Sequence, residues 1–412
     1  MLIHYTLIIK PVSSSCNLDC SYCYYSQPVT ALWSGNRIVM SDTVLETLIS
    51  KAFLSSPSMD VVFVWHGGEP LLAGIDFFRK IVTFQKKYQG QHRVFNSIQT
   101  NGLLINVTWC EFFKVNDFLV GVSLDGPERL NDEYRKRKDG FASFKTILKG
   151  IKLLTNYKVN FNTLTTVNKT NSHFPDKVFD ALIDAGSTNI QFIPIVQPGM
   201  NQINHNLPAV NPKKNERTEQ FLWAVDADAY GNFLIRIFNR WVHHYVGKLF
   251  VSNFESLLAN YLGYISIICT ESSRCGTGIV VECNGDVFSC DHYVIPVNKL
   301  GNILDYSFHD MVNSQEHQRF SNKKAEMLTG DCLSCEYLKL CFGGCPKDRF
   351  VSLNGSENLQ NYLCLGLKRF YSYAIPYIRF MANELENHRS PANIMLAIKN
   401  GFITSKIDAY LT

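Results

Sequence analysis

Three cysteines near the start of the chain have the spacing of a metal-binding loop. Cys16, Cys20 and Cys23 follow one another as Cys-x3-Cys-x2-Cys, so one short segment can direct three thiolates at one centre. Cysteine thiolates are the usual ligands of [4Fe–4S] clusters, with one ligand for each iron. Three ligands leave one iron open to a substrate or cofactor. The competing interpretations are a zinc site, which needs a fourth ligand nearby, and a redox-active Cys-x2-Cys pair.

A second group of nine cysteines occupies fewer than a hundred residues from Cys269 onward. Eight of them follow the order Cys269-x5-Cys275-x14-Cys290, then Cys332-x2-Cys335-x5-Cys341-x3-Cys345, and finally Cys364. This density predicts a second region organised by metal. The competing interpretation is a pair of zinc sites, which the Cys-x2-Cys spacing within the group would also suit.

Two of the 13 cysteines stand outside these patterns. Cys110 lies in an apolar segment with helical spacing and Cys283 ends a predicted strand, so we expect both to be packing thiols. The first residues lack the features of a signal peptide, and no stretch approaches the ~18–20 apolar residues of a membrane span. We therefore expect a cytoplasmic protein with no membrane partner, in which cysteines bind metal rather than form disulfides.

The overall composition is that of a globular protein, with 46% hydrophobic and 18% charged residues. The net charge is +4, and Lys and Arg form no long run. Because tracking a phosphate backbone needs a concentrated basic face, we expect no nucleic-acid partner.

The elements that must position these cysteines alternate between strand and helix in the first half of the chain. Strands are expected at 3–9, 61–65, 94–98, 118–124, 159–167 and 190–195, and helices at 41–54, 77–88, 144–154 and 174–185. Six β–α repeats predict an α/β fold with a parallel sheet covered by helices. Six units are fewer than the eight of a closed barrel, so we expect a partial (β/α)6 barrel.

Residues able to bind a ligand follow the ends of these strands. The first cysteines come after the first strand, Gly67-Gly68-Glu69-Pro70 after the second and Gln99-Thr100-Asn101-Gly102 after the third, while Ser123 and Asp125 close the fourth. In parallel α/β folds this edge of the sheet carries the active site.

With Tyr22 before the last cysteine of the first loop and Gly-Gly-Glu-Pro after the second strand, the chain resembles the radical S-adenosylmethionine (SAM) superfamily. The resemblance implies that SAM chelates the open iron and that the reduced cluster cleaves it to a 5′-deoxyadenosyl radical. It also implies that Tyr22, Gly67, Gly68, Glu69, Ser123, Arg135 and Val196 contact the cofactor. For Arg135, within Arg-Lys-Arg-Lys, the competing interpretation is a solvated loop.

The spacing of the later cysteines is similar to the SPASM extension of radical enzymes, which holds two auxiliary [4Fe–4S] clusters. The implied ligands are Cys269, Cys275, Cys290 and Cys345 for the first, and Cys332, Cys335, Cys341 and Cys364 for the second. Fully ligated clusters suit electron transfer. The chain would carry three [4Fe–4S] clusters, with a barrel over 1–235, linker helices over 236–268, the auxiliary-cluster domain over 269–380 and a tail over 381–412.

Within the superfamily the chain looks most similar to anaerobic sulfatase-maturing enzymes, through motifs such as WHGGEP, QTNG, SLDGP, QFIPIVQP, GDVFSCDHYV, LGNI and GGCPKDRF. Those enzymes oxidise a Cys or Ser of a sulfatase to formylglycine, using the radical, a carboxylate base and the auxiliary clusters. Asp291, directly after Cys290, occupies the place of that base. The competing interpretation of Asp291 is a surface residue beside a cluster loop.

The chain departs from that group around the Gly-Gly turn. Sulfatase maturases usually have Gln before the glycines and Thr after the proline, whereas this chain has His66 and Leu71. The pair resembles SPASM enzymes that cross-link side chains of ribosomally made peptides, such as cyclophane- and darobactin-type maturases. Because both changes fall where the substrate should lie, we favour cross-linking over formylglycine formation. A histidine hydrogen-bonded for structure is the competing interpretation of His66.

Either reaction implies a precursor peptide or protein as substrate and an electron donor such as flavodoxin or ferredoxin. The first strand is expected to begin about three residues from Met1, which leaves no room ahead of it for a leader-binding domain. A leader would then dock on the barrel or on the cysteine domain. The non-catalytic alternatives are an electron carrier, which would fill all four positions of the first cluster, and a zinc-organised scaffold.

Overall fold

The computed structural model describes residues 6–26, 39–56, 58–196, 223–266, 268–352, 358–402 and 410. Within this part the chain divides into two compact units, each assembled from separate stretches of sequence. The first contains Met1–Ser123, Asn131–Asn162 and Arg274–Lys323, and the second contains Leu124–Leu130, Thr163–Ser273 and Lys324–Thr412. Residues 198–217 are rich in Asn, Pro and Lys, a composition that predicts a loop, and they lie outside the described residues.

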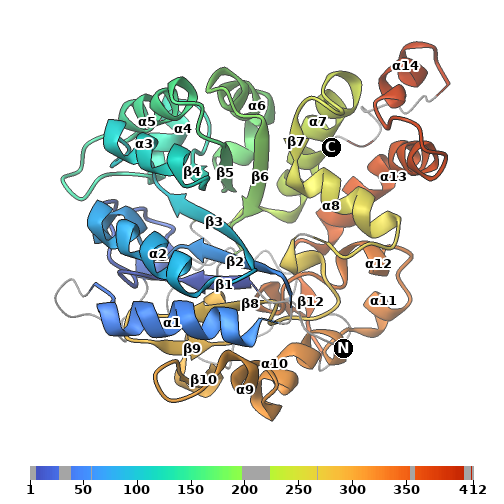
Figure 1. Ribbon diagram of the computed structural model, residues 1–412. Coiled ribbons are helices and arrows are strands. Elements are labelled where there is room, and N and C mark those ends of the chain that lie inside the picture. The colour runs from blue at the N-terminus through green and yellow to red at the C-terminus, as the bar shows by residue number, and fades with distance from the viewer. Residues whose placement is uncertain are drawn as a thin grey trace. The chain divides into compact units, whose positions relative to one another are not determined.

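The first unit is built on a sheet whose central strands are parallel (Figure 1). In spatial order the strands are β10 (Lys299–Asn302), β9 (Asp286–Phe288), β8 (Gly278–Val281), β1 (Thr6–Ile9), β2 (Asp60–Trp65), β3 (Arg93–Thr100) and β4 (Leu119–Ser123). The five strands from β8 to β4 run parallel to one another. Strand β9 is antiparallel to β8 on one side and to β10 on the other. Strands from the cysteine-rich region therefore extend the sheet of the N-terminal strands.

Two helices of the first unit, α1 (Asp42–Ser55) and α2 (Ile75–Tyr88), pack side by side on this sheet (Figure 1). Helix α1 begins where the sequence predicts, because the Ser41 side chain accepts a hydrogen bond from the Val44 amide. Phe53 of α1 packs on Phe63, and Phe78 of α2 packs on Trp65, so aromatic rings cover β2. The unit also contains α3 (Val107–Val115), α5 (Phe144–Asn156) and α9 (Phe308–Val312).

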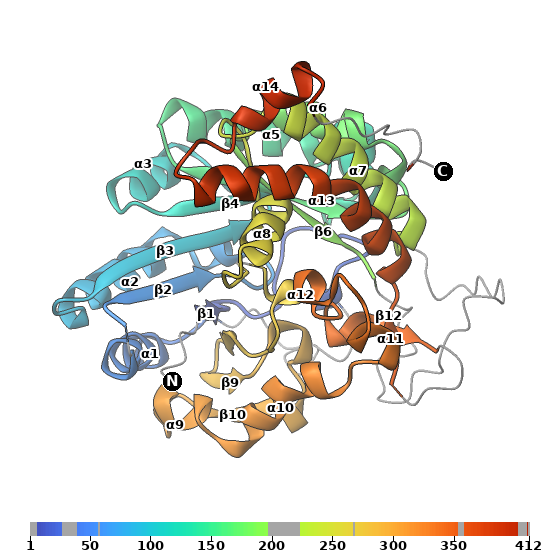
Figure 2. The same ribbon diagram turned by 90° about the vertical axis from the view of Figure 1, so that its right-hand side faces the viewer.

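The second unit combines three parallel strands with a group of long helices. Its strands are β5 (Phe161–Val167), β6 (Asn189–Pro194) and β7 (Phe250–Val251). Helix α13 (Cys364–Glu386) packs along α7 (Ala227–His244) and against α8 (Ser252–Tyr261), as Figure 2 shows. The remaining elements are α6 (Pro175–Asp184), α11 (Gly330–Leu333), α12 (Leu338–Cys341), α14 (Asn393–Lys399), β11 (Arg349–Val351) and β12 (Gln360–Asn361). Helices α4 (Glu128–Tyr134) and α10 (Gln315–Glu326) have residues in both units.

The predicted α/β fold with its alternating elements is confirmed. Strands β1 to β6 and helices α1, α2, α5 and α6 lie within a few residues of their predicted positions. Residues 61–65 of β2 are all apolar, and they alternate between buried and half-buried because successive side chains of a strand point to opposite faces of the sheet. No helix in the described part of the chain is both long and apolar enough to cross a membrane.

One contact in the second unit brings the backbones of α7 and α13 together. A Cβ atom added at Gly366 would lie 1.8 Å from the carbonyl oxygen of Ala227, and one added at Gly231 would lie 2.6 Å from the carbonyl oxygen of Gly366. Only glycine permits this approach. The contact lies next to Cys364, so it helps to fix the position of that predicted ligand.

We expect Gly366→Ala to destabilise the protein by about 3 kcal/mol or more, because the helices must separate to make room for the methyl group. Urea unfolding followed by circular dichroism measures the change. Gly330→Ala is the matched control, since no atom lies within 4 Å of the added Cβ; it should change the free energy of unfolding by less than about 0.5 kcal/mol. Equal stability of the two variants would contradict the described contact.

Candidate active site

The loop after β1 carries the three N-terminal cysteines, all half-buried. The Cys23 amide donates a hydrogen bond to the Cys20 carbonyl (2.9 Å), which closes a tight turn between these two residues. The Cys16 sulfur accepts from the Leu18 amide at 3.4 Å and lies 3.6 Å from the Asn101 side-chain nitrogen. The loop thus bends back around Cys16. Such a bend is needed if three cysteines of one short segment are to bind the same cluster.

The Gly-Gly turn after β2 packs directly on the segment that leads into this loop. The Gly68 amide donates to the Ser13 carbonyl and the Glu69 amide to the Ser15 carbonyl, both at 2.8 Å. A Cβ atom at Gly67 would lie 2.5 Å from the Ser13 oxygen, and one at Gly68 would lie 2.2 Å from the Ser15 oxygen. The glycines therefore permit a close approach of backbone to backbone, and this approach positions the cysteine loop.

Glu69 joins the turns that follow β2 and β3. Its carboxylate, fully buried, accepts hydrogen bonds from the Thr100 hydroxyl (2.9 Å), the Asn101 amide (2.8 Å) and the Leu71 amide (3.0 Å). Burial raises the pKa of Glu69 to about 7 despite these donors. In this structure Glu69 orders the loops around Cys16, and its predicted contact with SAM stays a prediction.

Arg135 lies against the cysteine loop rather than in a solvated segment. Its side chain is 7% exposed and its guanidinium lies 5.6 Å from the centre of the Tyr22 ring. The neighbouring backbone pairs with the loop, because the Asp19 amide donates to the Lys136 carbonyl at 2.8 Å. Ser123, at the end of β4, accepts from the Gln99 side chain at 3.1 Å.

Val196 lies in the second unit after β6 and is buried. The contacts of Tyr22, Ser123, Arg135 and Val196 with SAM remain predictions.

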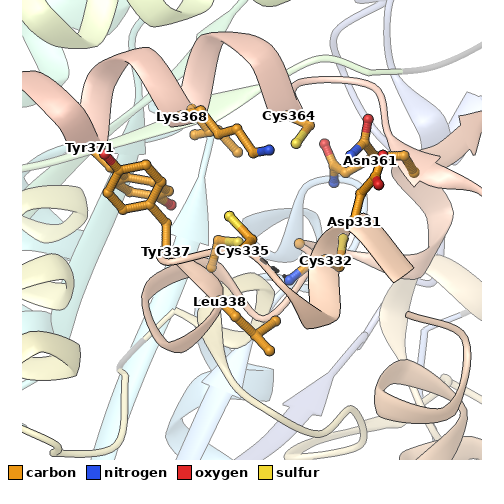
Figure 3. Close-up of a pocket in the computed structure, with 14 residues that line it drawn as sticks. Asp331, Cys332, Cys335, Tyr337, Leu338, Asn361, Cys364, Lys368 and Tyr371 are labelled. Atoms are coloured by element: carbon orange, nitrogen blue, oxygen red, sulfur yellow. Dashed lines mark hydrogen bonds between the residues drawn. The ribbon is translucent and has the colours of Figure 1, made fainter. Parts of the chain in front are cut away.

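Four of the later cysteines, Cys332, Cys335, Cys341 and Cys364, line one pocket of the second unit. Figure 3 shows the sulfur atoms of Cys332, Cys335 and Cys364 directed into this pocket. Burial, opposed in part by the charge of Lys368, raises the pKa of the Cys364 thiol to about 12, and neighbouring thiols contribute. The grouping agrees with the ligand set predicted for the second auxiliary cluster.

The chemistry of these donors fits iron–sulfur clusters. Burial and then the charge of Glu69 raise the pKa of Cys16 to about 11, so its thiolate needs a cation beside it, as cluster iron provides. In the described part of the chain, no three His, Cys, Asp or Glu side chains already stand at metal-ligand distances. Bringing the thiols of each set onto a cluster requires side-chain adjustment.

The other cysteines divide into predicted ligands and packing residues. Of the set predicted for the first auxiliary cluster, Cys275 and Cys290 belong to the first unit and Cys269 and Cys345 to the second, and this set stays a prediction. Cys110 and Cys283 are buried, as expected of packing thiols.

Asp291 is the centre of a charged network in the first unit, and its side chain is only 14% exposed. One carboxylate oxygen, Oδ1, forms an ion pair with Lys10 Nζ at 2.7 Å. The other, Oδ2, accepts hydrogen bonds from the hydroxyls of Tyr24 and Tyr25, the latter at 2.6 Å. Asp291 is therefore not the surface residue of the competing interpretation.

The charges around Asp291 keep it ionised. Burial alone would raise its pKa, but the charge of Lys10, followed by those of His66 and His292, holds the pKa of this carboxyl well below its usual range. Burial and the charge of Asp291 raise the pKa of both tyrosines, so both remain protonated donors. An ionised carboxylate with fixed donors is suited to accept a proton or to orient a substrate.

His66 has a structural role in the turn and also reaches this network. Its Nδ1 accepts a hydrogen bond from the Gly67 amide at 2.8 Å and lies 3.2 Å from the Tyr25 hydroxyl.

Sequence analysis missed Lys10, Tyr24 and Tyr25 as members of the site. The available signals were two phenols directly after Cys23 and a lysine that ends an apolar strand.

Known proteins with similar sequences and structures carry the same kinds of domain that the cysteine loops indicate. Residues 11–182 match the model of the radical SAM superfamily, and residues 269–336 match an iron–sulfur cluster-binding domain, SPASM. A serine-type anaerobic sulfatase-maturating enzyme of Bacteroides thetaiotaomicron is 40% identical over 96% of this chain and 95% of its own length. A cysteine-type enzyme of Clostridium novyi is 34% identical over 92% of this chain and 98% of its own. The solved structure of native anSMEcpe with bound AdoMet and Cp18Cys peptide matches with a TM-score of 0.80 at 31% identity, covering 92% and 99% of the two chains.

Fold and site together define a radical SAM enzyme with a SPASM domain, which uses S-adenosylmethionine and [4Fe–4S] clusters to oxidise peptide side chains. Within that class, the chain belongs to the family that contains the anaerobic sulfatase-maturating enzymes.

The shared pocket predicts that Cys364→Ala removes one cluster without affecting the rest. Iron in anaerobically prepared protein should fall from ~12 to ~8 atoms per chain. Cys110→Ala is the control, since Cys110 is buried on α3 and belongs to no predicted ligand set, and should leave the iron content unchanged. Iron analysis and electron paramagnetic resonance measure the outcome, and a full iron content in Cys364→Ala would exclude it as a ligand.

Proposed function

We propose that this enzyme oxidises a cysteine or serine side chain of a sulfatase to formylglycine. The observation that carries the proposal is that relatives matching more than nine-tenths of the chain are named for this maturation. They favour the reaction that sequence analysis ranked second, behind cross-linking of a precursor peptide. The preference for cross-linking depended on His66 and Leu71. Since His66 also orders the Gly-Gly turn through its bond from the Gly67 amide, its presence is a weak sign of a different reaction.

The reaction separates one hydrogen atom, one proton and one electron from the substrate. When bound, SAM and the three clusters would supply two things. One is a radical that removes a Cβ hydrogen atom, and the other is an acceptor for the electron. The predicted ligands of the first cluster are Cys16, Cys20 and Cys23. The chain itself must accept the proton. A serine then becomes the aldehyde directly, whereas a cysteine becomes a thioaldehyde that water converts to the aldehyde with release of hydrogen sulfide.

Asp291 is the proposed acceptor of this proton. A general base must be deprotonated before the reaction, and Lys10 holds Asp291 in that form. The hydrogen bonds from Tyr24 and Tyr25 fix the direction of the carboxylate. His66, through the Tyr25 hydroxyl, is proposed to face the substrate beside Asp291.

The setting of the reaction belongs to the same proposal. The chain is proposed to work in the cytoplasm, where a reducing environment favours cysteines that bind metal over disulfides. An electron donor such as flavodoxin or ferredoxin would reduce the first cluster. The barrel over 1–235, the linker over 236–268, the auxiliary-cluster domain over 269–380 and the tail over 381–412 remain the proposed domains.

Two peptides that differ only in the target residue test the reaction. Anaerobic incubation with SAM and reductant should lower the mass of the cysteine peptide by ~18 Da or that of the serine peptide by ~2 Da, and the product should react with a hydrazide, as an aldehyde does. A peptide with alanine at the target should stay unchanged. A loss of ~2 Da with a new bond between side chains and no hydrazide reaction would establish cross-linking instead.

Asp291→Asn should retain formation of 5′-deoxyadenosine and lower the yield of formylglycine by about 100-fold, because an amide cannot accept the proton. Chromatography and mass spectrometry measure both products in one incubation. Asp305→Asn, at an exposed aspartate of the same unit, serves as control and should keep the full yield. A full yield from Asp291→Asn would remove this residue from the mechanism.

A further inference from the structure

Lys10 is a buried cation between two carboxylates of the first unit. Its side chain is 2% exposed, and its Nζ lies 2.9 Å from Glu282 Oε1 and 2.7 Å from Asp291 Oδ1. The Tyr25 ring centre lies 4.7 Å from the same nitrogen. A buried ammonium without partners is costly, so these contacts are needed to keep Lys10 inside. Burial opposes the charge, but Asp291 and Glu282 raise the pKa of Lys10 above its ordinary value.

The sheet fixes Lys10 and Glu282 relative to each other. Strands β1 and β8 are parallel neighbours with Ile9 opposite Val281, so Lys10 and Glu282 are the next residues at the same edge. The Lys10 amide donates to the Val281 carbonyl at 2.9 Å. Glu282 is held in turn by the Ser13 hydroxyl, which donates to Oε2 at 2.7 Å. This pair therefore has a defined position in the sheet.

Asp291 lacks such support from its own backbone. It begins a single 3-10 turn, Asp291–Tyr293, beyond the end of β9. Its carboxylate direction is set by side chains, with Lys10 on Oδ1 and the two tyrosines on Oδ2. Of these partners, Lys10 is the one anchored at a strand end, since Tyr24 and Tyr25 lie in the short 3-10 turn Tyr24–Ser26 that follows Cys23. Removing Lys10 would leave Oδ1 without its ion pair.

We propose that Lys10, itself held by Glu282, is a positioning residue that fixes the Asp291 carboxylate for proton transfer. The inference rests on the proposed function, in which Asp291 is the base. Lys10 touches neither substrate nor cofactor in this scheme and acts through Asp291. Its loss lets the carboxylate turn away, so hydrogen-atom abstraction continues while proton transfer fails. The measurable consequence is a lower yield of formylglycine for each 5′-deoxyadenosine formed.

The test compares this yield ratio in four variants of the network and one control variant. Lys10→Met/Glu282→Gln removes both members of the ion pair, so no unpaired charge of the pair stays buried, whereas Glu282→Gln alone keeps Lys10. Asp291→Asn and the triple variant complete a mutant cycle. Lys80→Met is the control, because Lys80 forms an exposed ion pair with Asp42 in the same unit.

The double variant should lower the ratio by about tenfold or more, and adding Asp291→Asn to it should give no further loss beyond that of Asp291→Asn alone. Lys80→Met should stay within about twofold of the parent ratio. Glu282→Gln keeps the charge of Lys10 but weakens its hold, so it should lower the ratio less than the double variant does. A merely structural role would lower iron content and SAM cleavage together and leave the ratio unchanged.

The outcomes separate this inference from the proposed function. A parental ratio in the double variant with a reduced ratio in Asp291→Asn overturns the role of Lys10 and leaves Asp291 as the base. A parental ratio in Asp291→Asn removes Asp291 as the base, and with it the role of Lys10, whereas an absence of formylglycine with the parent enzyme overturns the proposed function itself. If the double variant fails to bind iron, the same yield ratio is measured in Lys10→Gln. The amide of this variant can still donate a hydrogen bond to Glu282, but it carries no charge to pair with Asp291.

Discussion

The parallel pairing of β1 with β8 is the constraint on which the site of the first unit depends. It brings Lys10 and Glu282, which are 272 positions apart, to the same edge of one sheet. The chain leaves β1 into the cysteine loop, and it leaves β9, the antiparallel neighbour of β8, toward Cys290 and Asp291. Because adjacent parallel strands end at the same edge, Lys10 and Glu282 lie together there, and Lys10 then pairs with Asp291 from the segment after β9.

A second constraint acts on the cysteine loop through the backbone. The Gly67-Gly68 turn lies so close to Ser13 and Ser15 that no side chain fits between them. Glu69 then links this turn to the turn after β3. Three loops from different strands are thus tied by hydrogen bonds before any cofactor is considered. Such preorganisation suits a site that must hold a reactive cofactor in one orientation.

The second unit meets a different requirement, the gathering of four thiols from separate segments. Cys332 lies on α11, Cys341 ends α12 and Cys364 begins α13, and the three elements surround one pocket (Figure 3). The backbone contact between Gly231 and Gly366 holds the start of α13 against α7. A fully ligated cluster there suits the transfer of an electron, and burial raises the pKa of the Cys341 and Cys364 thiols.

The sequence by itself determined the features that depend on local spacing. The loop of Cys16, Cys20 and Cys23 and the alternating strands and helices could be predicted because their patterns lie within short windows. Asp291 was recognisable because it adjoins Cys290. Only the tertiary structure decided that Lys10 pairs with Glu282 and Asp291, and that Tyr24 and Tyr25 bond to the same carboxylate. Those contacts join distant segments, and a lysine at a strand end looks the same in sequence whether it meets water or a buried acid.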